Sequence, residues 1–410
     1  HIAPLGPFTV EYDANPLFNA GTLPRLRTAT WILLCALGKT VWPCALSCHY
    51  GDGPFPLVTA TADPRFLGAA SVLLALAAAA FRARRHAPAL ALAAAAWFGF
   101  SFITSNLAFP IETNFGDRLF YIPVLGFALL LAAAAAHCPA RWRTPAILLL
   151  AAWVAWNAGQ SVARSRAWFD NTTLFTTDVT HQPSSVGLHI DLAGVQASRF
   201  DAAGSRATLR RAAELNPHSA RALRLLAESV AGPEAEPLLR RALASPLLVR
   251  ATEGKRVLWQ LGAVYARDGR PAAARAAVEA ALACDPFDEH VRMHLLRETL
   301  RAGELQRCRW LLDAGLALRP DDPNLVLYRA ALAHHQRQFA AAAQDFARCL
   351  DHLPPLQFVV EGRLWHADSL LQLGDPTGAR RIAVQIRSHA ARWPETAAEC
   401  ARLLTAAAPR

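Results

Sequence analysis

The chain has 410 residues, 53% of them hydrophobic, and its mean hydropathy of +0.18 is higher than is usual for a soluble protein. Its net charge is +10, and all of its basic residues except Lys39 and Lys255 are arginines. These arginines are spread along the chain and form no basic run interleaved with aromatic residues, which argues against nucleic-acid binding. The length leaves room for two or three domains.

The first apolar stretch, Thr28–Cys48, follows a proline-rich N-terminal segment. It carries Lys39 in its middle and Pro43 near its end, whereas a helix that crosses a bilayer needs about 20 predominantly apolar residues. We therefore expect an interfacial or re-entrant helix here, with Trp31 and Trp42 at the level of the lipid headgroups.

Four stronger apolar stretches predict a bundle of transmembrane helices within residues 65–163: Phe66–Phe81, Ala87–Asn106, Leu119–Ala136 and Thr144–Val162. The short loops 82–86 and 137–143 are basic and contain no acid, and the positive-inside rule places such loops in the cytoplasm. Residues 1–64, the loop 107–120 and everything after residue 163 then lie outside. We expect an integral membrane protein, either of a bacterial inner membrane with periplasmic repeats or of the endoplasmic reticulum with luminal repeats.

The second half of the chain, residues 184–410, is predicted to be an array of helix pairs that follows a linker helix within residues 164–183, at Ser165–Asp178. Prolines at 183, 217, 246, 286, 320 and 354 are separated by steps of 34, 29, 40, 34 and 34 residues. A helical period of 34 residues is typical of tetratricopeptide repeats. The clearest repeat ends at Pro286 and has these residues at helix-packing positions: Leu261, Gly262, Tyr265, Gly269, Ala274 and Ala281.

The predicted fold class is therefore all-α, a polytopic membrane helix bundle followed by a tetratricopeptide-type α-solenoid. Such a solenoid is a right-handed superhelix of helix pairs with a concave face.

The sequence indicates no metal site. The eight cysteines form neither a CxxC pair nor a Cys/His set with zinc spacing, and we expect them to pack as small apolar residues in helices. The adjacent His334 and His335 would point about 100° apart on a helix, so they are better explained as a solvent-facing pair. Whether a divalent metal takes part in the function stays open.

The polar loop within residues 105–127 is the least generic part of the chain. It places Glu112, Asp117 and Arg118 between two apolar runs, and charged groups at the edge of the hydrocarbon are costly unless they face water or a partner. Arg118 could contact a phosphate or a carboxylate of a ligand. Alternatively, a salt bridge between Asp117 and Arg118 locks the loop.

Three blocks of the membrane half resemble the C-terminal membrane region of the transmembrane and tetratricopeptide-repeat-containing O-mannosyltransferases. The first is Asn15-Pro16 with residues 23–27. The second is residues 46–50, which match a Leu-Ser-x-Asp-Tyr pattern except that His49 replaces the aspartate. The third block runs through Ser105-Asn106, Phe109-Pro110, Gly116-Asp117-Arg118 and Tyr121-Ile122-Pro123. A repeat domain directly after the last span completes the order of that family.

The resemblance implies a C-type glycosyltransferase that moves a sugar, mannose in this family, from a polyprenyl- or dolichyl-phosphate donor to protein hydroxyls. Arg118 would contact the donor phosphate, Asp117 would orient Arg118, Tyr121 would shape the loop, and Asn106 is a further candidate for donor binding. The catalytic acids of the family lie upstream of His1. We therefore assign no catalytic residue, expect a piece of a longer protein, and expect no turnover from this segment alone.

In the implied enzyme, the repeats would hold the acceptor protein or peptide through polar and aromatic side chains of the inner helices. The candidates are Trp259, Tyr265, Tyr328 and Trp365, unless they prove to be buried. Two other interpretations stay open. One is a non-catalytic, membrane-anchored repeat scaffold for protein–protein interaction, which the missing acids favour. The other is a polymerase or ligase for lipid-linked glycans.

Overall fold

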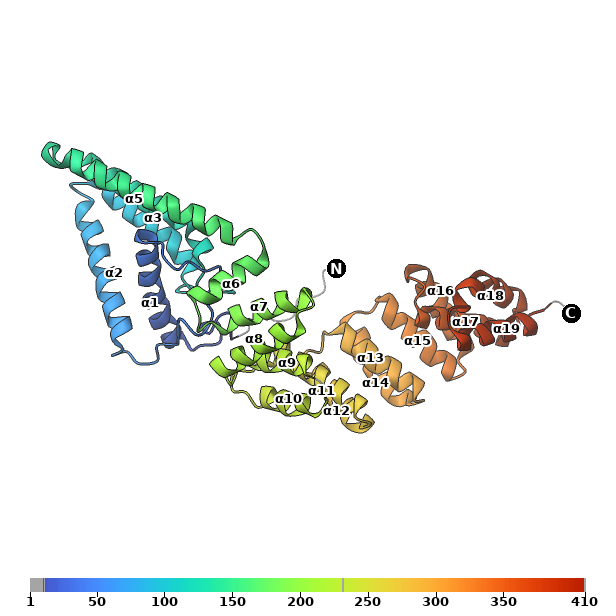
Figure 1. Ribbon diagram of the computed structural model, residues 1–410. Helices are drawn as coiled ribbons and strands as arrows, with labels where there is room; N and C mark the ends of the chain where they lie inside the picture. Colours follow the sequence, from blue (N-terminus) through green and yellow to red (C-terminus); the bar gives the residue numbers. More distant parts are fainter. Residues whose placement is uncertain (1–9, 11, 231, 409–410) are drawn as a thin grey trace. The chain divides into compact units, whose positions relative to one another are not determined.

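The computed structural model describes residues 10, 12–230 and 232–408, and every regular element in these residues is a helix. The all-α fold class is thus confirmed. The chain divides into two compact units, Pro7–Ala274 and a second that contains Arg275–Arg410 (Figure 1). The first unit holds the apolar helices and the first repeats, and the second holds the later repeats. The predicted domain boundaries at residues 64, 163 and 183 stay predictions.

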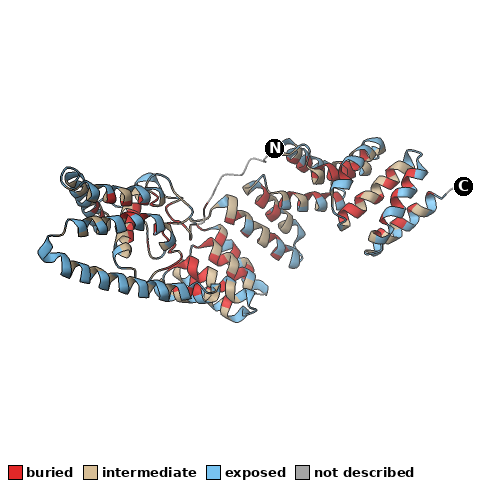
Figure 2. Ribbon diagram, turned by 90° about the horizontal axis from the view of Figure 1, so that it is seen from above, coloured by how far each residue is buried: buried red, intermediate tan, exposed pale blue. Residues whose placement is uncertain are grey.

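Four helices of the first unit follow the predicted transmembrane stretches: α2 (Pro64–Ala83), α3 (Pro88–Thr104), α4 (Tyr121–Ala136) and α5 (Ala140–Ala167), with the short 3₁₀ helix η1 (Asp117–Phe120) before α4. Within the described residues, three segments are long and apolar enough to cross a membrane, namely α2, η1 together with α4, and α5, whereas α3 has only 17 residues. These helices are largely exposed (Figure 2), and exposed apolar surface of this extent indicates contact with lipid or with another protein. Membrane association is therefore suggested, and the orientation in the membrane stays a prediction.

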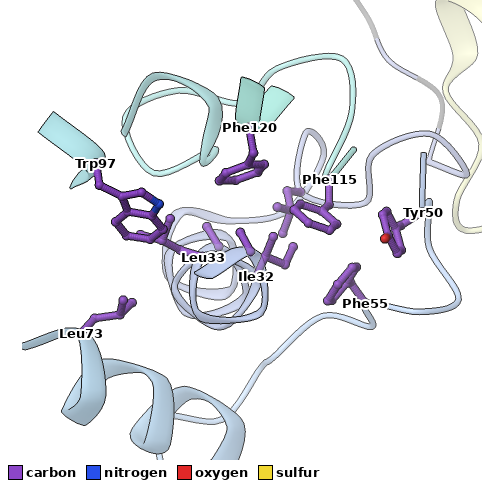
Figure 3. Close-up of a cluster of buried hydrophobic side chains, with 11 residues drawn as sticks. Ile32, Leu33, Tyr50, Phe55, Leu73, Trp97, Phe115 and Phe120 are labelled. Atoms are coloured by element: carbon purple, nitrogen blue, oxygen red, sulfur yellow. The ribbon is translucent and has the colours of Figure 1, made fainter. Parts of the chain in front are cut away.

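Helix α1 (Thr22–Val41) forms the centre of the apolar half. Its buried face, with Ile32 and Leu33, packs in one hydrophobic cluster with side chains from α2, α3, η1 and the neighbouring loops (Figure 3). The other residues labelled in that view are Tyr50, Phe55, Leu73, Trp97, Phe115 and Phe120. The helix ends at Val41 because the residue before Pro43 disfavours the α conformation.

The two tryptophans of this segment contact other aromatic rings. Trp31 packs edge-on against Phe55, with ring centroids 5.2 Å apart, and Trp42 stacks on Trp156 of α5 at 5.3 Å. Helix α1 is not among the helices that are apolar enough to cross a membrane. Its predicted interfacial or re-entrant position stays a prediction.

Helices α3 and α4 approach each other closely at Gly126. A Cβ atom at this position would lie 2.5 Å from the backbone nitrogen of Trp97, which is closer than non-bonded atoms can approach. Small residues at helix contacts permit such packing in membrane proteins. We infer that position 126 tolerates only glycine without movement of α3 away from α4.

The linker helix predicted over residues 165–178 begins later than expected, because the structure divides this segment in two. Helix α5 continues to Ala167, and α6 (Asn171–His181) begins after Asp170. The Asp170 carboxylate accepts a hydrogen bond from the Thr173 N–H at 2.9 Å. An aspartate at this capping position favours the start of a new helix.

The repeats are built from six helix pairs and a final helix. The pairs are α7 (Val186–Ser198) with α8 (Ala202–Leu215), α9 (Ala220–Ser229) with α10 (Ala235–Leu243), α11 (Lys255–Arg267) with α12 (Pro271–Cys284), α13 (Glu289–Arg301) with α14 (Leu305–Leu318), α15 (Pro323–His335) with α16 (Phe339–Cys349), and α17 (Gln357–Gln372) with α18 (Pro376–Ala390), and α19 (Pro394–Ala406) follows. Five of the six prolines used to predict the period lie three residues before a pair, and Pro246 precedes α11 with the turn η3 between them, which confirms the helical repeats. The superhelical shape of the whole array stays a prediction.

The two irregular steps of the proline period have a local cause. Helices α9 and α10 have only 10 and 9 residues, and a π-helical turn, η3 (Arg250–Gly254), is inserted before α11. The shortened pair gives the step of 29 residues and the inserted turn gives the step of 40.

The turn inside a repeat pair contains one residue with a left-handed backbone. Glycine occupies this place at Gly269, Gly303 and Gly374, with φ between 70° and 84°. Phe200 and Arg337 stand at the equivalent place in their pairs, with φ of 64° and 60°. Because side chains disfavour this conformation, these two turns are strained.

All eight cysteines are free thiols. Cys48, Cys308, Cys349 and Cys400 are buried, as expected of small packing residues, whereas Cys44 is exposed in the loop after α1. The expectation that every cysteine packs in a helix is therefore wrong for Cys44 and Cys48, which follow the end of α1, and for Cys138, which lies between α4 and α5.

Candidate functional site

A polar pocket of about 200 Å³ lies in the first unit, where the loops of the apolar half meet the first repeats. It is lined by Ala14, His49, Glu112, Thr113, Arg118, Gly187, Asp191 and Arg221. Each of the three sequence blocks contributes to it or ends next to it, and α7 and α9 complete its wall. The pocket is therefore the place where the blocks and the repeats come together.

Two buried asparagines join the first block to the third. The Asn15 side chain donates hydrogen bonds to Asn106 Oδ1 at 2.9 Å and to the Ile111 carbonyl at 2.7 Å. Asn106 donates in turn to the carbonyls of Thr113 and Asn114 at 3.1 and 3.2 Å. These bonds fix the loop that carries Arg118. Asn106 is itself buried, so it supports the loop rather than lining the pocket.

Asp117 joins the third block to the second. Its carboxylate accepts the Ser47 N–H at 2.5 Å and the Tyr50 hydroxyl at 3.1 Å. Burial, together with the nearby Asp117 carboxylate, raises the pKa of Tyr50, so the phenol stays protonated and donates. The structure records no salt bridge between Asp117 and Arg118 among the described residues. The expectation that Asp117 orients Arg118 is therefore corrected: Asp117 fixes the loop of Ser47 and Tyr50.

A second buried carboxylate, Asp178 of α6, holds the same loop from the other side. It accepts hydrogen bonds from the Cys48 N–H at 2.7 Å and from the Arg164 guanidinium at 2.5 and 3.1 Å. Burial and the neighbouring Asp178 raise the pKa of the Cys48 thiol to about 12, which keeps this thiol protonated and unreactive. No motif in the sequence marks Asp178 as part of the site.

Two further acids tie the loops to the repeats. Asp13 accepts the Ser219 hydroxyl at 2.6 Å at the start of α9, and Asp52 accepts the Asn216 amide at 2.9 Å. The fit is tight at Gly53, where a Cβ atom would overlap the carbonyl of Ser184. The loops of the apolar half and the first repeats therefore form one hydrogen-bonded body.

Within the pocket, Asp191 is shared by two cationic or potentially cationic groups. His49 Nε2 lies 2.9 Å from Asp191 Oδ2, and the Arg221 guanidinium lies 3.6 Å from Oδ1. Arg118 is exposed and has no ion-pair partner among the residues that the structure describes. Its guanidinium is therefore free to bind an anion, such as a phosphate or carboxylate group, in the pocket.

The four donor-binding candidates therefore differ in whether they line the pocket. Arg118 lines the pocket, Asn106 and Asp117 hold its loops in place, and Tyr121 is 86% exposed at the start of α4 without being part of the lining. His49, which stands where the family pattern has an aspartate, points its ring at Asp191.

The four acceptor-binding candidates on the repeats differ in how far they are buried. Tyr265 and Tyr328 are buried, and their hydroxyls are hydrogen-bonded to Arg240 and to the Met293 carbonyl. They are therefore corrected to packing residues. Trp259 and Trp365 are half-buried and keep surface for a ligand.

Metal binding has no support in the described part of the chain. No group of three or more His, Cys, Asp or Glu side chains there could hold a metal ion. The rings of His334 and His335 are 5.7 Å apart at 79° to each other, and His334 Nδ1 lies 3.0 Å from the Ser369 hydroxyl.

No protein-family model and no curated protein sequence matches the chain. Solved structures that match parts of it include PilF of Pseudomonas aeruginosa, with 20% identity and a TM-score of 0.41 over 54% of this chain and 96% of that one. PilW, described as a widely conserved type IV pilus biogenesis factor, has 20% identity and a TM-score of 0.39 over 52% and 96%. YrrB, described as a TPR protein with an unusual peptide-binding site, has 16% identity and a TM-score of 0.36 over 46% and 97%. All three TM-scores are below 0.5, so the repeat assignment rests on the helix pairs and turns described above.

Proposed function

We propose that this chain is a membrane-associated helical-repeat protein whose repeats bind a protein partner, and that it acts as a scaffold at the membrane surface. The observation that carries the proposal is the run of helix pairs from α7 to α18, which begins soon after α5, a helix long and apolar enough to cross a membrane. Stacked helix pairs provide extended binding surfaces. The hydrogen bonds between the loops and the first repeats would hold those repeats close to the bilayer.

Trp365 on α17 is the most suitable contact residue for a partner. It is half-buried, and its ring lies near those of His334, His335 and Phe358, with centroids 5.3 to 6.3 Å apart. Partly buried aromatic side chains held by neighbours are typical anchors of protein interfaces. Trp259 on α11 is a second candidate.

We expect Trp365→Ala to weaken partner binding by about tenfold or more, because loss of an aromatic anchor costs roughly 2 kcal/mol. Peptides would be selected from a random display library on the full chain in lipid nanodiscs, and the enriched peptide would be titrated against each variant. Trp310→Ala is the matched control, because Trp310 lies on α14 and is 68% exposed. Equal losses in both variants would contradict the role of Trp365, and a library that yields no binding peptide would count against the scaffold.

The convergence of the three blocks favours a second candidate function, namely sugar transfer. In this proposal, the pocket binds the phosphate of a polyprenyl- or dolichyl-phosphate-linked sugar, mannose by resemblance, and the repeats hold the acceptor protein. Arg118 supplies the phosphate contact, since a guanidinium can bind phosphate through two parallel hydrogen bonds. No described residue is assigned as catalytic base, and the topology with the pocket on the periplasmic or luminal side is part of the proposal.

Donor binding provides a test that does not require turnover. We expect Arg118→Ala to lower the affinity of the full chain in nanodiscs for polyprenyl-phosphate mannose by about 10- to 100-fold, because a charge-assisted hydrogen bond contributes about 1.5–3 kcal/mol. Arg143→Ala removes an exposed arginine near the start of α5 and should leave the affinity unchanged. Affinity that is equal in Arg118→Ala and in the wild type would exclude Arg118 as the phosphate contact.

A further inference from the structure

Three exposed aromatic side chains lie on two segments that an ion pair joins, the end of α5 and the turn between α7 and α8. Trp168 and Phe169 directly follow α5 and are 48% and 88% exposed, and Phe200 in the turn between α7 and α8 is 96% exposed. An ion pair of 3.8 Å between Arg199 and Asp170 joins the two segments. We call Trp168, Phe169 and Phe200 the aromatic patch.

Phe200 is an unexpected residue for its position. The equivalent turn residues Gly269, Gly303 and Gly374 are glycines. Phe200 shares its left-handed backbone, with φ of 64°, with the non-glycine Arg337, but Phe200 presents a large apolar side chain to solvent. Such a residue costs energy both through its backbone and through its contact with water. A strained conformation of this kind commonly marks a functional position.

The surface beside Phe200 is also apolar. A groove of about 450 Å³ begins at Phe200 and continues between α7, α8 and α9, with Ile190, Ala197 and Leu209 in its lining. The patch therefore adjoins a larger apolar surface.

The length of α5 relates the patch to the bilayer. Its 28 residues extend roughly 42 Å, which is about the thickness of a bilayer with its headgroups. Trp142 near its start and Trp168 at its end are both exposed, and tryptophans are enriched at the two interfaces of a membrane. Helix α5 is inclined to α2 (Figure 1).

The charges around the patch suit a lipid surface. Arg166 is exposed beside Trp168, and arginines near a membrane surface attract anionic headgroups. The acids next to the patch are engaged in helix capping, Asp170 at the start of α6 and Asp201 at the start of α8.

We propose that the aromatic patch inserts into the headgroup layer of the membrane on the side where α5 ends. The first repeat would then contact the membrane through the turn between α7 and α8, in addition to the membrane crossing by α5. The partner is the lipid surface itself. The proposal rests on the proposed membrane crossing by α5, and the contact would fix the direction in which the first unit leaves the bilayer.

Spin labels attached to a keto amino acid, which avoids the native cysteines, test the depth of each site in anionic liposomes. The full chain would be labelled separately at positions 154, 200 and 268, in the middle of α5, in the patch and in the equivalent turn between α11 and α12. We expect position 154 to be reached by oxygen but not by a water-soluble nickel chelate. Position 200 should be severalfold less accessible to the chelate than position 268, while oxygen still reaches it.

The outcomes distinguish failure of the proposed membrane crossing by α5 from failure of the proposed lipid contact of the aromatic patch. If position 154 is open to the chelate, α5 does not cross the membrane and both proposals fail. If position 154 is protected but position 200 is as accessible as position 268, only the lipid contact fails. If neither reagent reaches position 200, protein covers the patch and the lipid contact is likewise excluded.

A variant that retains the fold gives an independent test. Phe200→Gly places the preferred residue in the left-handed turn, so the variant should melt at the same or a higher temperature. A label at Ala203 on α8 should nevertheless become severalfold more accessible to the nickel chelate than in the wild-type background. Unchanged accessibility in a stably folded variant would overturn the role of Phe200.

Discussion

Replacing Asp178 with alanine is expected to destabilise the first unit by about 3–5 kcal/mol, the usual cost of removing one partner of a buried ion pair. The Asp178 carboxylate is buried and accepts hydrogen bonds from the Arg164 guanidinium and the Cys48 N–H. Without it, the guanidinium of Arg164, whose side chain is 13% exposed, has no counter-charge. The full chain in detergent should show a lower Tm, and the amides of residues 46–50 should exchange with deuterium faster.

The same carboxylate predicts a dependence on pH. Burial opposes the ionisation of Asp178, but hydrogen bonds from Arg164 and from the Cys48 N–H outweigh burial, and its pKa lies below the usual value. Its stabilising contribution is therefore complete above the pKa of an unfolded aspartate, about 3.9. It is lost as the pH falls through the lower pKa of the folded state. The stability difference between the wild type and Asp178→Asn should stay constant from about pH 5 to 8 and shrink only below about pH 4.

Asp170 provides the matched control on the same helix. It caps α6 at a partly exposed site, so Asp170→Ala should cost only about 1 kcal/mol. A loss for Asp178→Ala no larger than this would contradict the importance of the buried pair. A stability difference that disappears already near neutral pH would show that Asp178 is not ionised in the folded protein.

The repeats could be predicted from sequence because their signals are local. A proline before each pair ends the preceding helix, and Gly269 supplies a left-handed turn at low energetic cost. Phe200 and Arg337 stand at the same turn without any such signal. Nothing in their side chains favours the left-handed backbone, so only the packing of the flanking helices could have indicated it.

The apolar helices were predictable for a similar reason, since length and hydropathy alone identify them. The central position of α1 in the apolar half could not be predicted in this way. It depends on contacts with Tyr50, Phe55 and Trp97, which are distant in sequence. The break between α5 and α6 has a local signal in the sequence, the capping residue Asp170.

The site was predictable only in part. Their adjacency predicts that Asp117 and Arg118 interact, but neighbouring residues on a helix project in different directions. Asp117 faces the loop of Ser47 and Tyr50, and Arg118 faces the pocket. Asp191 and Arg221 belong to the repeats and meet His49 only in the folded chain.

Asp178 had a weak signal that could have been used. It lies four residues after Leu174 on α6, and residues at this spacing share one face of a helix. Both are buried. An acid on the apolar face of a short helix indicates a buried partner, here Arg164, although the sequence does not identify which arginine it is.

The second large effect is expected at Asn106. Its amide makes the full set of four hydrogen bonds, accepting from Asn15 at 2.9 Å and from the Ile111 N–H at 2.9 Å and donating to two carbonyls. Its backbone is left-handed, with φ of 60°, a conformation that asparagine tolerates better than most residues. We expect Asn106→Ala to cost about 4 kcal/mol, because several buried hydrogen bonds of about 1 kcal/mol each are lost and alanine strains the backbone.

Three comparisons identify the cause of that loss. Asn106→Gly removes the same hydrogen bonds but relieves the backbone, so it should be about 1 kcal/mol less destabilising than Asn106→Ala. Asn106→Asp keeps the size but sets a carboxylate against the carbonyls of Thr113 and Asn114. Asn19→Ala is the control, because the exposed Asn19 makes one hydrogen bond to the part of the chain that the structure describes, to the Val10 carbonyl at 3.1 Å, and should cost less than about 1 kcal/mol.

Thermal unfolding of the full chain in nanodiscs would give the order of these variants, and deuterium exchange at residues 107–118 would locate the effect. If Asn106 fixes the loop that carries Arg118, the alanine variant should lose protection across this loop and also bind anions in the pocket more weakly. An Asn106→Ala variant that keeps the loop protected would mean that Asn15 and Asn114 hold it without Asn106. Weaker anion binding with an intact loop would instead place Asn106 in direct contact with the ligand, as the family resemblance implies.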